Sequence, residues 1–113
     1  MNLSWLPDNS ALVEIVVSRY EYATLEDIKE TINEIRADAN SMIITFDLKE
    51  VDVPGPDKFK QIAHLISDVI EYTKHDNLLE RINIKNSGVL FRFFYRPFSL
   101  ALPREIREVI AFI

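Results

Sequence analysis

The chain has no cysteine among its 113 residues, and it has only two glycines. Without thiols it can form no disulfide and no cysteine-ligated metal site. This agrees with a reducing compartment, and we expect a cytoplasmic location. So few glycines argue against an all-β protein full of tight turns. No apolar run approaches the roughly 20 residues of a membrane-spanning helix, and the first residues do not have the pattern of a secretory signal.

The sequence also lacks the residue patterns of the common catalytic centres. It contains no G-x-S-x-G elbow, no Walker loop, no dinucleotide-binding glycine pattern and no H-E-x-x-H motif. His64 and His75 are eleven residues apart, which is not a spacing of metal ligands, and we expect them at a helix surface and a helix end. We therefore predict that the protein is not an enzyme and holds no cofactor or metal.

What is present is the composition of one soluble globular domain covering residues 1–113, with 48% hydrophobic and 27% charged residues. The net charge is −5, but residues 81–107 hold six basic residues and one acidic residue. This asymmetry could mark a surface for anions such as lipid head groups or phosphate. The alternative is a dipolar, solvated surface with no partner. The acidic total and the lack of a recognised module argue against a nucleic-acid partner.

Three stretches have the composition of β-strands. Residues 11–21 are rich in β-branched residues, residues 42–48 form a nearly continuous apolar run, and residues 79–84 follow the same trend. Apolar residues fall on both faces of the first strand, which predicts that it is covered on both sides, and the second fits a central buried strand.

Between these strands the apolar residues recur at spacings of three and four, which is typical of amphipathic helices. The first helix is expected from Thr24, a capping residue, to about Asn40, and the second from residue 58 to about Lys74. Strands joined by helices predict parallel neighbours with right-handed crossovers. Residues 1–10 read as a tail or cap, because Pro7 and the residues after it stop regular structure.

The segment after Gly88 is unusually aromatic, and we expect a helix over residues 89–98 that Pro97 ends or kinks. The rings can fill the core of a small protein, or some of them can form a pocket wall, a membrane-facing patch or an oligomer face. Two arginines four residues apart beside these rings would suit a lipid interface. The candidate surface consists of Phe91, Arg92, Phe94, Tyr95, Arg96 and Phe98. A further element begins at Arg104, and residues 109–113 read as a final strand.

A second candidate lies after the central strand. Asp47, Glu50, Asp52 and Asp57 cluster around one loop at its carboxyl end, where open α/β sheets tend to bind ligands. Acidic loops are common, so this pattern alone is a weak indication of a metal or catalytic pair. The residues considered there are Asp47, Lys49 and Asp52.

The segments "INIKNSGVLFRFFYRPFSLALPREIREVIAFI" and "MIITFDLKEV" resemble the core of the CRAL-TRIO lipid-binding domains. The order of elements also resembles the related STAS fold of anti-sigma factor antagonists, and Thr24-Leu-Glu-Asp27 is similar to the helix start of small stand-alone bacterial proteins of the joint STAS/CRAL-TRIO type. The resemblance implies an α/β fold with a mixed, mainly parallel sheet of four or five strands, helices packed on it and β-α-β-α-β-α-β order. The lipid-transfer proteins carry an extra helical domain and a gate, and we expect neither in this chain.

Two functions follow from the residues and the resemblance. The first is a binding module that meets a lipid or membrane surface through residues 89–98. The second is a STAS-type protein-interaction or regulatory domain, which could be a homodimer that buries the same patch. It would lack the phosphorylatable serine of the antagonists, because residues 49–57 contain no Ser or Thr. An enzyme that uses this loop is a third reading.

Overall fold

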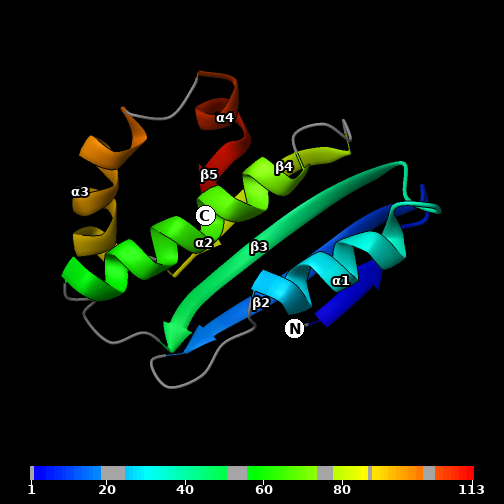
Figure 1. The fold of residues 1–113 in the computed structure, drawn as a ribbon, viewed down its shortest axis with the longest axis horizontal. Helices are drawn as coiled ribbons and strands as arrows, with labels where there is room; N and C mark the ends of the chain where they lie inside the picture. The colour runs from blue at the N-terminus through cyan, green and yellow to red at the C-terminus, as the bar shows by residue number, and fades with distance from the viewer. Residues whose placement is uncertain (1, 19–24, 51–55, 74–77, 87, 101–103) are drawn as a thin grey trace.

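The computed structural model describes residues 2–18, 25–50, 56–73, 78–86, 88–100 and 104–113. Two strands come first, helices and strands then alternate, and two helices precede the last strand (Figure 1). The elements are β1 Asn2–Trp5, β2 Ser10–Ser18, α1 Leu25–Ile35, β3 Ser41–Glu50, α2 Pro56–Thr73, β4 Leu79–Lys85, α3 Gly88–Ser99, α4 Arg104–Val109 and β5 Ile110–Phe112. The strictly alternating order that the sequence predicts is therefore not the observed one, although the coarser prediction of a mixed α/β fold is confirmed.

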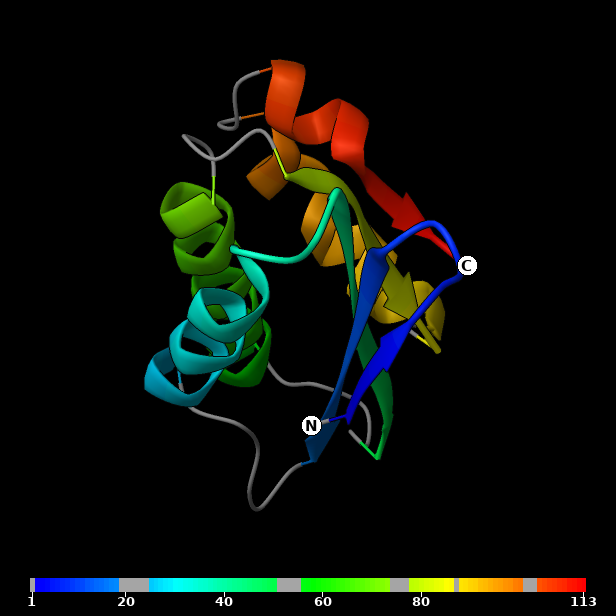
Figure 2. The same ribbon diagram turned by 90° about the vertical axis from the view of Figure 1, so that its right-hand side faces the viewer.

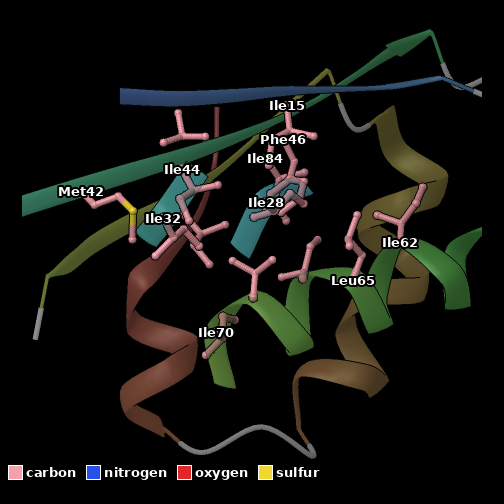
Figure 3. Packing of buried hydrophobic residues seen from close by; sticks show 14 of the residues in the cluster. Ile15, Ile28, Ile32, Met42, Ile44, Phe46, Ile62, Leu65, Ile70 and Ile84 are labelled. Carbon is pink, nitrogen blue, oxygen red and sulfur yellow. The ribbon is translucent and has the colours of Figure 1, made fainter. Parts of the chain in front are cut away.

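The five strands form one sheet in the order β1-β2-β3-β4-β5. β1 is antiparallel to β2, and the other neighbours are parallel, as predicted. Each parallel step moves the same way across the sheet, so right-handed crossovers bring every connecting helix to the same face. The views agree: the helices lie on one side of the strands (Figures 2 and 3).

The core lies between this face and the helices, and alternate strand residues fill it because successive strand side chains point to opposite faces. Figure 3 shows Ile15, Ile44, Phe46 and Ile84 pointing from the strands toward the helices. The buried members are Ala11, Val13, Ile15, Met42, Ile44, Phe46, Leu48, Ile82 and Ile84 from the strands, and Ile28, Ile32, Ile35, Ile62, Ala63, Leu65, Ile66, Val69 and Ile70 from the helices. In α1 the buried residues Ile28, Ile32 and Ile35 recur at spacings of four and three, as expected for one stripe of an amphipathic helix.

The prediction that β2 is covered on both sides is wrong. Leu12 and Glu14 point away from the helices and are only half-buried, as are their β3 neighbours Ile43 and Thr45. The apolar pattern of β2 does not show which of its faces the helices cover, because that depends on the order of the strands in the sheet.

The segment 1–10, expected as a tail or cap without regular structure, contains a strand. Residues 2–5 form β1, and the proline signal marks the turn that joins it to β2: the Asn9 N–H donates to the Leu6 carbonyl at 3.0 Å, and the Leu6 N–H donates to the Ser10 carbonyl at 2.9 Å. Asn9 has a φ of 64°, a conformation that Asn tolerates better than most residues. Asn40 then fixes the turn, since its side chain donates to the Asp8 carbonyl at 2.8 Å.

Several boundaries differ from expectation. α1 ends at Ile35, with a turn over 36–38, and not near Asn40. β3 continues to Glu50, so Lys49 belongs to the strand. Pro97 lies inside α3, two residues before its end. The predicted cap Thr24 lies outside the described residues.

Tyr72 of α2 joins the two helices that cover β2 and β3. Its hydroxyl donates to Asn33 Oδ1 at 2.7 Å. The Arg36 guanidinium carbon lies 4.6 Å from the centre of its ring, and Lys29 Nζ lies 5.2 Å away. Two cations and one hydrogen bond therefore fix this contact between α1 and α2.

Candidate binding surface on α3

The start of α3 is held to the carboxyl ends of β3 and β4. Asn86, directly after β4, has a φ of 58°, and Gly88 has a φ of 69°. These two left-handed residues turn the chain from the strand into the helix. The Asn86 side-chain amide donates to Asp47 Oδ1 at 2.9 Å, and Asp47 is 3% exposed. The same residue thus turns the chain and ties it to the central strand.

One side of α3 packs toward β5. The rings of Tyr95 and Phe112 are 5.0 Å apart and inclined by 74°, an edge-to-face arrangement. Phe112 is the register partner of Ile84, which faces the helices. Burial raises the pKa of the Tyr95 hydroxyl, and the nearby Arg107 guanidinium opposes this rise. Tyr95 is thus half-buried and belongs to the packing of the helix on the sheet.

The opposite side of α3 is exposed and apolar. Phe93 is 69% exposed and Leu100, the residue after the helix, is 76% exposed. With the exposed Pro97 they recur at spacings of four and three, which places them in one row along the helix. Large apolar side chains with this exposure in one row indicate a contact surface more strongly than the same residues scattered singly.

Arginines border this row. Arg96 is exposed and falls between Phe93 and Leu100 along the helix. Arg92 is exposed too, with its guanidinium carbon 5.5 Å from the centre of the Phe112 ring. The α3 sequence contains no acidic residue. We call Arg92, Phe93, Arg96, Pro97 and Leu100 the α3 surface.

The neighbouring helix α4 adds positive charge. Arg107 is exposed and close enough to Tyr95 to affect its ionisation. Arg104 is also exposed, but its Nε lies 3.0 Å from Glu108 Oε1, so this charge is offset within the helix. Four of the six basic residues in the segment 81–107 therefore lie on α3 and α4.

Of the residues predicted to form the surface, some are exposed in the structure and one packs on the sheet. Arg92 and Arg96 lie at the surface, whereas Tyr95 faces the sheet. The side chains of Phe91, Phe94 and Phe98 lie outside the part of the chain that is described. The predicted set omits Phe93 and Leu100. Their spacing is visible in the sequence, but which side of the helix faces the sheet is not.

Of the three predicted loop candidates, the structure describes the side chain of Asp47 alone. Asp47 lies within β3, where it is buried and bonded to Asn86, and the side chains of Lys49 and Asp52 lie outside the described residues. His64 is exposed on α2, as expected, and His75 lies outside the described residues. Among the described residues no three His, Asp or Glu side chains are placed to share a metal ion.

No described helix combines the length and the apolar character needed to cross a membrane. Comparisons of the chain with protein-family models, with curated proteins and with solved structures give no match.

Proposed function

We propose that the protein is a non-enzymatic binding module that docks reversibly on an anionic membrane surface through the α3 surface. The observation that carries the proposal is the row of Phe93, Pro97 and Leu100, exposed on a helix that has arginines and no acidic residue. Interfacial helices place apolar side chains at the acyl boundary and keep cationic groups among the lipid phosphates. Arg stems can lie along apolar surface while their guanidinium groups reach the head groups.

The magnitudes favour a weak, reversible attachment. Burial of an exposed Phe or Leu side chain is worth about 1.5–3 kcal/mol, and each arginine adds about 1 kcal/mol near an anionic leaflet. Immobilisation of the protein offsets part of this gain. Because the electrostatic part is screened within roughly 10 Å at 0.1 M salt, we expect binding to depend on both lipid charge and ionic strength.

The resemblance to the STAS/CRAL-TRIO superfamily supports this proposal, and membership of that superfamily is itself part of what we propose. Under this proposal the segment from Ile82 to Ile113 corresponds to the core of a lipid-binding domain, with α3 as the aromatic helix. We further propose a cytoplasmic location, where anionic lipids would be the natural target of a basic surface.

Co-sedimentation with vesicles tests the proposal. The wild-type chain should sediment with phosphatidylcholine vesicles that contain about one-third phosphatidylserine at low salt, and much less with pure phosphatidylcholine. The Phe93→Asp/Leu100→Asp double variant should lose this binding. Leu6→Asp is the matched control, because Leu6 is 39% exposed in the turn beside β1, at the other edge of the sheet. Failure of the wild type to bind anionic vesicles, or equal binding by the double variant, would overturn the proposal.

The alternative is a STAS-type protein-interaction module, and one observation favours it. The sheet face opposite the helices carries the neighbouring apolar residues Leu12 and Ile43, both half-buried. A protein partner could cover this face. Stable complex formation by a chain with no affinity for vesicles would favour this function, and light scattering measures it.

A further inference from the structure

β1 forms one edge of the sheet. It pairs with β2 on one side, and no described strand lies on its other side. The backbone N–H and C=O groups along such an edge can pair with another strand. β5, the opposite edge strand, has only three residues.

Apart from its short length, β1 lacks the devices that normally protect an edge strand. Its residues are Asn-Leu-Ser-Trp, with no charge and no proline. Its register with β2 runs from Asn2 to Trp5 without a shift, so no bulge twists the edge away. All four residues are exposed, and the large apolar ones, Leu3 and Trp5, are 39% and 45% exposed.

The side chains of β1 are arranged so that two copies of the strand fit each other. Leu3 and Trp5 are the register partners of Val13 and Ala11, so they lie on the helix side of the sheet, while Ser4 lies on the other side. In an antiparallel pair of β1 strands centred on Ser4, Leu3 faces Trp5 of the partner subunit, and Trp5 faces Leu3 of the partner subunit. Four apolar side chains then form one patch, and no like charges oppose each other.

We propose that β1 pairs antiparallel with β1 of a second copy of this chain, about a two-fold axis at Ser4, to form a continuous ten-stranded sheet. The axis runs perpendicular to the sheet, so both helix layers stay on the same side. A two-fold interface of this kind uses the same patch on both subunits. The uncharged strand favours a second copy over a charged partner.

The size of the contact sets its strength. Two four-residue strands bury well under the roughly 1,200 Å² of a standard stable interface. The dimer therefore forms in a concentration-dependent way. It is separate from the α3 surface, which lies beside the opposite edge of the sheet.

A single introduced cysteine tests both the pairing and its register, because the chain has no cysteine of its own. In the proposed register the Cβ atoms of the two Ser4 residues are about 5 Å apart, within reach of a disulfide after a small adjustment. Asn2 shares the strand, the face and the exposure, but the two Asn2 residues are about 13 Å apart because four residues separate them along the strands. Under mild copper–phenanthroline oxidation, Ser4→Cys should form covalent dimers at least ten times faster than Asn2→Cys.

Sedimentation equilibrium gives an independent readout over a wide concentration range. The wild type should show a reversible monomer–dimer equilibrium, and Trp5→Lys should shift it to monomer by placing a charge on the inner side of the edge strand. Leu100→Lys, a change to an exposed residue far from β1, should leave it unaltered. Equal cross-linking rates for the two cysteine variants, or a wild type that stays monomeric at the highest concentration, would overturn the proposal.

Discussion

Asn86 offers a sharp test of how the end of β4 positions α3. Its side chain donates to the buried Asp47 at 2.9 Å, and its backbone is left-handed with a φ of 58°. Asn86→Ala removes both the hydrogen bond and the tolerance for this conformation. Loss of a hydrogen bond to a buried carboxyl group costs about 1–3 kcal/mol, and an alanine forced into the left-handed region costs about 1–2 kcal/mol more. We expect Asn86→Ala to lower the free energy of unfolding by about 2–5 kcal/mol.

Asn86→Gly separates the two effects, since glycine adopts this conformation freely and lacks only the hydrogen bond. Its cost should be smaller than that of Asn86→Ala by about 1–2 kcal/mol. Urea unfolding followed by circular dichroism measures both variants, with Gln61→Ala on the exposed side of α2 as a control for the loss of a surface amide. If glycine proved as costly as alanine, or if both variants were as stable as the wild type, the dual role of Asn86 would be refuted.

Three further predictions concern stability. Tyr72→Leu should lower the free energy of unfolding by about 1–3 kcal/mol, because it removes two cation–π contacts as well as a hydrogen bond. Tyr72→Phe should lose only the hydrogen bond to Asn33 and should therefore be less destabilised. Thermal unfolding measures both variants, and equal losses of stability would argue against the cation–π contribution. Ile44→Ala should cost about 2–5 kcal/mol, and Ile43→Ala, one residue along on the open face, clearly less; a reversed ranking in urea would contradict the one-sided packing of the helices. Burial raises the pKa of Tyr95 in the folded chain, so folding disfavours ionisation of its hydroxyl, and the free energy of unfolding should fall as the pH rises above about 10, the pKa in the unfolded chain. Tyr95→Phe should flatten this fall, and the same pH profile in both proteins would refute the burial of the Tyr95 hydroxyl.

Much of the fold could be predicted because periodicity records which side of an element is buried. The spacing of Ile28, Ile32 and Ile35 identifies the inner stripe of α1, and the apolar runs at 42–48 and 79–84 are neighbouring parallel strands as expected. β1 was missed because a strand of four residues is too short for alternation to stand out. The sequence predicts helices on both faces of β2, because it does not reveal the order of the strands in the sheet. It is this order that brings all helices to one face.

The candidate surface was predictable only in part. The composition of α3 predicts an aromatic helix with arginines. Because apolar residues fall on most sides of this helix, its sequence does not show which side packs on the sheet. The contact of Tyr95 with Phe112 depends on the packing against β5, and it is this contact that turns Phe93 outward. Asp47 is a further example, because a carboxylate near a strand end suggests a ligand site in the sequence, and the structure adds that this buried carboxylate accepts a hydrogen bond from the exposed Asn86.

The central claim is that α3 enters the membrane interface, and the single tryptophan of the chain allows a direct test. Trp5 lies in β1, at the sheet edge opposite β5, and serves as the internal control in the wild type. A Phe93→Trp/Trp5→Phe variant instead places the only tryptophan on the α3 surface. With anionic vesicles containing brominated lipid, we predict strong quenching of the fluorescence of this variant and little quenching in the wild type. Quenching that is absent from the variant, or equal in both proteins, would contradict the account.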